Sequence, residues 1–271
     1  MKKFCFLLLI ATLLFSCKQG GQQNKKNDDK PVITVTIEPL RYFTEAIAGD
    51  RFTVVSMVPK GTSPETYDPT PQQLVELARS KAYFRIGYIG FEQTWTDKLT
   101  DNAPHLQFFD MSQGVDLIYD NTHVHHHATN KEEHQHTIGV EPHIWNSAVN
   151  AQIIAGNILN ALRNIDKGNE DFYLERYNTL CRKIEHTDSL IRQTLATPGA
   201  DHAFMIYHPA LSYFARDYGL HQISIEEGGK EPSPAHLKEL IETCRRDNAR
   251  VIFVQQEFDT RNARLLSLIH I

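Results

Sequence analysis

Short apolar runs alternate with segments of helical period through the first half of the chain. A helix is expected over residues 39–48, and runs typical of strands occupy 32–37, 52–58, 83–86 and 108–110. A second helix is expected to begin after Thr70, because Pro71 follows as the first helical residue and Gln73 completes a capping box. This alternation favours a mostly parallel sheet covered by helices on both faces.

The second half begins with a long helical stretch over residues 147–195. Apolar side chains recur at helical spacing in its second part, at Tyr173, Tyr177, Leu180, Ile184, Ile191 and Leu195. One helix of about 25 residues would be roughly 37 Å long, which suits a strut between two lobes. Strands at 203–207, 222–225 and 251–254 then alternate with helices at 209–218 and 234–246. We therefore predict an α/β fold of two lobes, each a mostly parallel sheet with flanking helices, joined by one long rigid helix.

The N-terminus has the pattern of a targeting segment. Lys2 and Lys3 precede an apolar run over residues 4–15, which has the length of a signal-peptide core and is too short to span a bilayer. The run ends in a sequence that resembles a bacterial lipobox, where cleavage would leave Cys17 as the lipid-carrying first residue. The alternative is an ordinary cysteine near an unlipidated cleavage site. We expect a periplasmic protein, lipid-anchored to a membrane of the cell envelope.

Composition and chain length set the expected domain boundaries. These are a signal peptide (1–17), a disordered tether without hydrophobes (18–30), an N-terminal lobe (31–146), a helical segment (147–197) and a C-terminal lobe (198–271). The chain stops inside an expected helix (260–271), so we expect the second lobe to be incomplete. The net charge is −5, and no cluster of basic residues suggests a surface that binds nucleic acid. Outside the leader, Cys181 and Cys244 are either a disulfide or two free thiols.

A histidine-rich run lies in the expected first lobe, over residues 123–136. It has no apolar period, and Glu132 and Glu133 stand among its six histidines, which are His123, His125, His126, His127, His134 and His136. Neutral imidazole is a common ligand for zinc, copper and nickel, so a loop rich in it is a multidentate chelator. The alternative is a solvated loop without a role.

Three residues outside that run share one expected setting, the junction between a strand and the next helix. Glu65 follows the strand at 52–58, His143 precedes the helical stretch, and His208 follows the strand at 203–207. Ligands of open α/β sheets bind outside the carboxyl ends of the strands, so a cleft between two lobes could join the three. A helix N-terminus would also favour neutral imidazole. Taken singly, each residue is more often structural than a metal ligand.

Four segments carry a resemblance to a known family: GTSPETYDPTPQQL, VEPHIWNS, FMIYHPALSYFARDYGL and EEGGKEPSP. In this order, over about residues 32–262, they resemble the zinc- or manganese-specific solute-binding lipoproteins of bacterial ABC importers. The resemblance implies two α/β lobes joined by a long helix, with one metal ion in the cleft between them. It also implies a His-rich loop near residues 123–136 in zinc-specific members.

The resemblance assigns Glu65, His143 and His208 as metal ligands, with one departure. Family members usually have histidine where this chain has Glu65, which leaves one oxygen and two imidazoles, a set acceptable to zinc and less unfavourable to manganese. Where the family has a fourth ligand, the resemblance implies a carboxylate near the C-terminus, beyond the end of this chain; water or Glu226 could take its place.

The function predicted is binding of Zn²⁺, with Mn²⁺ the alternative, and delivery to an ABC permease and its ATPase subunit. We expect a monomer and no catalysis, because no general-base motif accompanies the ligands. The alternatives from other classes are an adhesin-like lipoprotein with a structural metal and a metal-dependent hydrolase.

Overall fold

A four-stranded parallel sheet forms the first lobe in the computed structural model, which describes residues 30–120, 139–226 and 232–255. Its strand order is β2-β1-β3-β4. The strands are β1 (Val32–Val35), β2 (Thr53–Ser56), β3 (Ala82–Arg85) and β4 (Gln107–Asp110). All four predicted strands are present; β1 and β2 are shorter than their apolar runs, and β3 and β4 each begin one residue earlier than predicted.

Three helices belong to this lobe: α2 (Glu38–Ala48), α3 (Pro71–Leu77) and α4 (Gly90–Asn102). The capping box predicted at Thr70 is present, with Gln73 N–H bound to the threonine hydroxyl. Helix α4 was not predicted. Its sequence is polar, and it buries only Phe91, Glu92 and Leu99, so its apolar period is weak.

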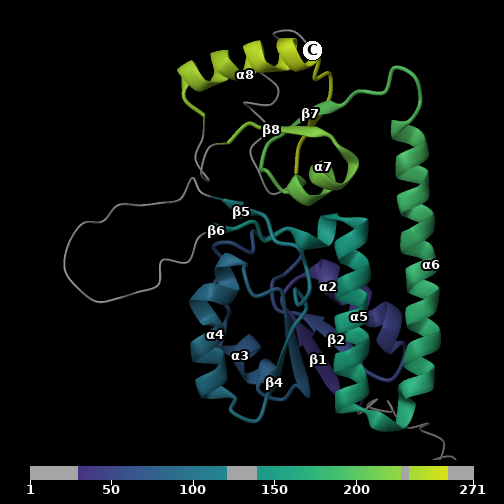
Figure 1. The fold of residues 1–271 in the computed structure, drawn as a ribbon. Helices are drawn as coiled ribbons and strands as arrows, with labels where there is room; N and C mark the ends of the chain where they lie inside the picture. The colour runs from purple at the N-terminus through teal and green to yellow at the C-terminus, as the bar shows by residue number, and fades with distance from the viewer. Residues whose placement is uncertain (1–29, 121–138, 227–231, 256–271) are drawn as a thin grey trace, which may run out of the picture. The chain divides into compact units, whose positions relative to one another are not determined.

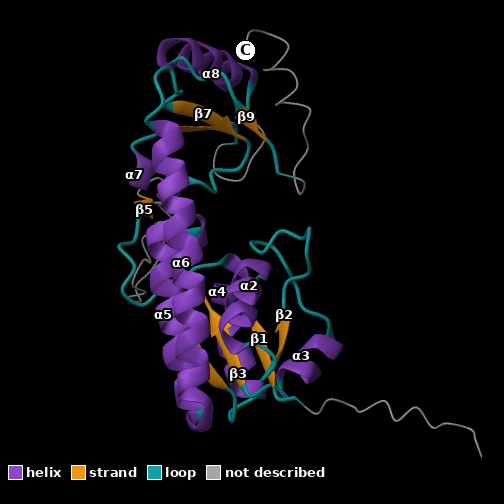
Figure 2. Ribbon diagram, turned by 90° about the vertical axis from the view of Figure 1, so that its right-hand side faces the viewer, coloured by secondary structure: helices purple, strands orange, loops and turns teal. Residues whose placement is uncertain are grey.

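The predicted helical stretch is two helices, α5 (Ala148–Ile165) and α6 (Glu170–Leu195), separated by a 3₁₀ turn, η3 (Lys167–Asn169). The second is the predicted long helix, with 26 residues, or roughly 39 Å at 1.5 Å per residue. It packs along α5 and α2 at its N-terminal end and leads to the second sheet at its C-terminal end (Figures 1 and 2).

The second lobe is a three-stranded parallel sheet of order β8-β7-β9. The strands are β7 (Ala203–Ile206), β8 (His221–Ser224) and β9 (Ile252–Phe253). The helices are α7 (Ser212–Tyr218), which ends at Gly219 in the left-handed conformation, and α8 (Pro234–Asp247), which lies over the sheet (Figure 2). The predicted fold class is thus confirmed; the helix predicted over 260–271 lies outside the described residues.

A two-stranded antiparallel ribbon was not predicted. It pairs β5 (Tyr119–Asp120) with β6 (Gly139–Val140), and a 3₁₀ turn, η2 (Ile144–Asn146), leads from it to α5. The His-rich run, 123–136, falls between its strands and outside the described residues. Strands of two residues are too short to show an alternating pattern, so the sequence does not predict them.

The structure decides between the two alternatives for the cysteines outside the leader. Cys181, which is partly exposed, and Cys244, which is buried, are both free. In the described ranges, none of the helices combines the length and the apolar character needed to cross a bilayer.

Candidate metal site

Two of the three predicted ligands meet face to face. His143 caps the start of η2, and His208 lies in the loop between β7 and α7. Their Nε2 atoms are 3.2 Å apart, and their rings cross at 70° with centroids 4.9 Å apart. Two nitrogens bound to one tetrahedral zinc at about 2.05 Å would be roughly 3.3 Å apart. The pair therefore already has the spacing of two ligands on one ion.

A carboxylate holds the other ring nitrogen of each histidine. Glu141 Oε1 accepts from His143 Nδ1 in a close contact and from the His143 backbone N–H at 3.0 Å. Glu226 Oε1 accepts from His208 Nδ1 at 2.5 Å. Because a carboxylate only accepts, the proton in each contact lies on Nδ1. In the neutral ring with this tautomer, Nε2 is the nitrogen that can bind a metal.

These carboxylates refine the sequence reading. Glu226, considered above as a fourth ligand, lies behind His208 and is 7 % exposed. Glu141 was missed, although a carboxylate two residues before a candidate histidine ligand is a signal that could have found it. The expected setting also differs in part. His143 follows an antiparallel ribbon rather than a strand of the parallel sheet, and α7 begins at Ser212 rather than directly after His208.

The His208 backbone is held by Gln255, two residues after β9. Gln255 Nε2 donates to His208 O at 2.8 Å, and its Oε1 accepts from His208 N–H at 3.3 Å. This amide fixes the loop between β7 and α7, so the histidine is positioned through both its main chain and its ring.

Glu65 is a partly buried loop residue with one oxygen engaged and one not. Gly90 N–H donates to Oε2 at 3.0 Å, while Oε1 is buried and has no hydrogen-bond partner. The approach depends on glycine, because a Cβ at Gly90 would lie 2.5 Å from Glu65 O and 2.8 Å from Oε2. A buried carboxylate oxygen without a partner is unfavourable unless a cation or a donor reaches it.

Buried Glu92 organises the loop that carries Gly90. Its carboxylate accepts from three backbone N–H groups, of Ile86 (2.9 Å), Gly87 (2.5 Å) and Ile89 (3.4 Å). The Thr36 hydroxyl also donates to it at 2.5 Å. Burial raises the pKa of Glu92, and these hydrogen bonds oppose the rise. The segment GYIG, which is too weak a motif for a phosphate loop, is thus wrapped around a carboxylate of its own lobe.

The structure joins two of the three predicted ligands. Within the described ranges, no group of three or more His, Cys, Asp or Glu side chains is arranged to hold a metal ion. That Glu65 completes the site with the two histidines therefore stays a prediction, and the His-rich run lies outside the described residues.

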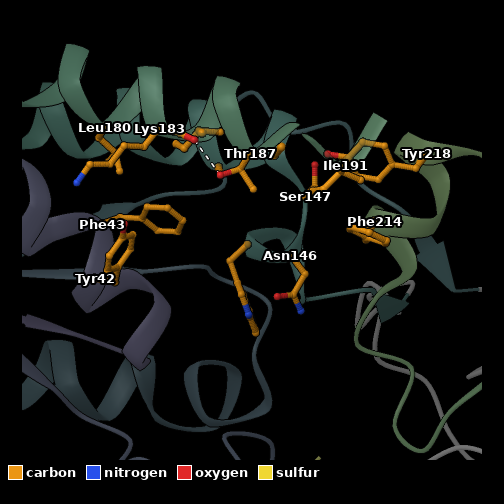
Figure 3. Close-up of a pocket in the computed structure, with 14 residues that line it drawn as sticks. Tyr42, Phe43, Asn146, Ser147, Leu180, Lys183, Thr187, Ile191, Phe214 and Tyr218 are labelled. Carbon is orange, nitrogen blue, oxygen red and sulfur yellow. Dashed lines mark hydrogen bonds between the residues drawn. The ribbon is translucent and has the colours of Figure 1, made fainter. Parts of the chain in front are cut away.

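An apolar crevice beside this site has a different character (Figure 3). It has a volume of about 290 Å³ and is lined by Ser147 and by residues of α2, η2, α5, α6 and α7. Phe43, Leu180 and Phe214 give it an apolar wall, and none of its lining residues is His, Cys, Asp or Glu. It is not a metal site.

Comparison with known proteins identifies the family to which this chain belongs. Residues 33–267 match the family described as zinc-uptake complex component A, periplasmic (ZnuA). The chain belongs to this family. Family members are metal-binding proteins of ABC import, so the predicted family and its function class are confirmed.

Individual relatives differ in the metal they are named for. The chain is 28 % identical to the high-affinity zinc uptake system protein ZnuA of Bacillus subtilis, over 97 % of this chain and 82 % of that protein. It is 29 % identical to the manganese ABC transporter substrate-binding lipoprotein PsaA of Streptococcus pneumoniae, over 98 % of this chain and 86 % of that protein. A crystal structure of ZnuA has a TM-score of 0.78 at 34 % identity, covering 89 % of this chain and 88 % of that one.

Proposed function

We propose that this protein captures one zinc ion between His143 and His208 and delivers it to the membrane permease of an ABC importer. The observation that carries the proposal is the histidine pair, whose two Nε2 atoms stand 3.2 Å apart while both Nδ1 atoms are held by carboxylates. This is the arrangement in which imidazoles act as metal ligands, because the carboxylate fixes both the tautomer and the ring orientation.

The third ligand in this proposal is Glu65. Its Oε1 is buried without a hydrogen-bond partner, while its Oε2 is fixed by Gly90. A metal ion bound between the histidines would be the partner that the buried Oε1 does not have in the protein. Two imidazoles and one carboxylate leave a position for water, as in three-ligand zinc sites.

Zinc is the favoured cargo because two of three proposed ligands are imidazoles. Nitrogen ligands suit zinc better than manganese, and the Irving–Williams order places zinc above manganese at a given site. Manganese is the second candidate, since PsaA relatives are named for it and Glu65 contributes a hard oxygen.

The proposal includes the chain outside the described residues. Cys17 would carry the lipid, with residues 18–30 as a tether that keeps the protein near its permease and ATPase. The His-rich run would raise the local zinc concentration without forming the tight site. Deleting residues 123–136 should then lower the total zinc bound per protein and leave the tightest site unchanged.

The test is a chelator-competition titration with zinc and with manganese on residues 18–271 lacking 123–136. The His143→Ala, His208→Ala double variant is compared with a matched control, His186→Ala, His202→Ala, which removes two exposed histidines elsewhere. One tight zinc site, lost only in the first variant, is the expected result. Equal binding in both variants would refute the site, and tighter manganese than zinc binding would refute the cargo.

A further inference from the structure

The hydroxyl of Tyr213 bridges the two residues that adjoin the β5–β6 ribbon, Ile118 before β5 and Glu141 after β6. By the register of the ribbon, Ile118 and Glu141 form its next pair. A hydrogen-bonded antiparallel pair exchanges two N–H···O bonds. Here Glu141 N–H donates directly to Ile118 O at 2.9 Å. The second bond is divided: Ile118 N–H donates to the Tyr213 hydroxyl at 3.1 Å, and the hydroxyl donates to Glu141 O at 2.8 Å.

Tyr213 comes from the opposite lobe. It belongs to α7, yet its side chain is fully buried within the hydrophobic core of the first lobe. The guanidinium of Arg216 lies 5.0 Å from the centre of its ring and donates to Asp116 O at 2.7 Å. Tyr213 and Arg216 of α7 therefore both contact the segments that adjoin the ribbon. Of these two side chains, only Tyr213 hydrogen-bonds to both segments, through its hydroxyl.

The residue held by this hydroxyl is the one that orients a proposed metal ligand. Tyr213 fixes the carbonyl of Glu141, and the carboxylate of Glu141 binds both the backbone N–H and Nδ1 of His143. The other histidine, His208, lies five residues before Tyr213 in the same lobe. Both rings are thus positioned relative to a single segment, the end of β7 and the start of α7.

We propose that Tyr213 is a positioning residue for metal binding, whose hydroxyl sets the position of Glu141 and through it the distance between His143 and His208. The proposal rests on the proposed function. Removal of the hydroxyl lets Ile118 N–H and Glu141 O bond to each other directly. That closes the ribbon, moves the Glu141 main chain and displaces the His143 ring from its place opposite His208.

The experiment compares Tyr213→Phe with Tyr218→Phe in the chain from residue 18 onward. Tyr218 is a matched control because it lies on the same helix, and its hydroxyl donates to Asp188 Oδ1 at 2.8 Å, away from the ribbon. Each substitution removes one buried or half-buried hydroxyl and keeps the ring. Tight zinc binding is measured by chelator competition, and the ligand geometry by the visible absorption spectrum of bound Co²⁺.

Loss of a group that orients a metal ligand costs about 10- to 100-fold in affinity. We expect that loss for Tyr213→Phe, with a changed Co²⁺ spectrum, and wild-type affinity and spectrum for Tyr218→Phe. If Tyr213→Phe does not fold, 4-aminophenylalanine at position 213 replaces it. That side chain keeps a donor to Glu141 O, and the affinity should return toward the wild-type value.

Wild-type affinity and an unchanged Co²⁺ spectrum in Tyr213→Phe would overturn the proposal, as would equal losses in the two phenylalanine variants. With the 4-aminophenylalanine protein, affinity as low as that of the His143→Ala, His208→Ala variant would do the same. Tight zinc binding that survives in that double-histidine variant is a different failure, because it refutes the proposed site itself.

Discussion

Replacing Gly90 by alanine should weaken zinc binding while leaving the fold intact. Gly90 is the first residue of α4 and lacks a positive φ, so alanine fits its backbone conformation and gains about 0.5–1 kcal/mol of helix propensity. The added Cβ would lie 2.5 Å from Glu65 O, against 3.4 Å for an ordinary contact. Because that neighbour is main chain, the Gly90 and Glu65 backbones must move apart by about 0.9 Å to relieve the overlap.

A movement of that size exceeds what a metal ligand tolerates. Metal–ligand distances hold to within about 0.2 Å, so in the proposed site Glu65 would no longer reach the ion. We expect a zinc affinity about 10- to 100-fold lower, equivalent to about 1.4–2.7 kcal/mol. The unfolding free energy of the metal-free protein should change less, because the gain in propensity offsets part of the strain of about 1–3 kcal/mol.

The assay is chelator competition for zinc, with thermal unfolding of the metal-free protein beside it. Gly156→Ala is the matched control, because Gly156 lies within α5 and its added Cβ would meet only the Tyr177 hydroxyl at 3.9 Å. It should raise stability slightly and leave affinity unchanged. In a Glu65→Ala background, Gly90→Ala should have no further effect on affinity. A full additional loss there would refute the reasoning, as would wild-type affinity in the single variant.

Three further outcomes are expected. Glu141→Gln and Glu226→Gln should each lower zinc affinity about 10- to 100-fold, because each removes the carboxylate that holds a histidine of the site. Asp247→Asn is the control, because it removes a carboxylate from His221, outside the site, and should leave the affinity unchanged. Chelator competition measures the zinc affinity of all three variants. Glu92→Gln should destabilise the protein by about 1–3 kcal/mol in denaturant titration, because its amide nitrogen cannot accept from the buried N–H groups that the carboxylate satisfies. Burial raises the pKa of Tyr213 to about 12, so the folded state holds this proton more tightly than the unfolded chain, and stability present below about pH 10 should be lost as the pH rises toward 12. The check is the absorbance near 295 nm of the wild-type protein minus that of Tyr213→Phe, because the exposed tyrosines ionise in both; a difference that rises well before unfolding would contradict this.

The sequence was most informative where local rules act alone. Every strand of both parallel sheets was predicted, because each falls on a short apolar run between segments of helical period. The long helix was predicted because its apolar residues keep one period over 26 residues. Helix α4 was missed because it lacks such a period: one of its buried positions holds a carboxylate, Glu92, instead of an apolar residue.

The metal site divides along the same line. The residue types and the positions of His143 and His208 next to strand ends were enough to nominate them, and Cys17 and the six histidines at 123–136 are visible only in the sequence. What each histidine faces depends on groups far away in the chain, since His143 and His208 are 65 residues apart. No local pattern encodes a distance between two such nitrogens.

The sequence by itself thus determined the fold class, the family and two residues that the structure brings together. The tertiary structure decided that these imidazoles meet through Nε2, that Glu141 and Glu226 stand behind them, and that Tyr213 of one lobe holds the main chain of the other. Propensity and period act between neighbours in the chain, whereas a ligand's orientation comes from hydrogen bonds that form only when distant segments pack.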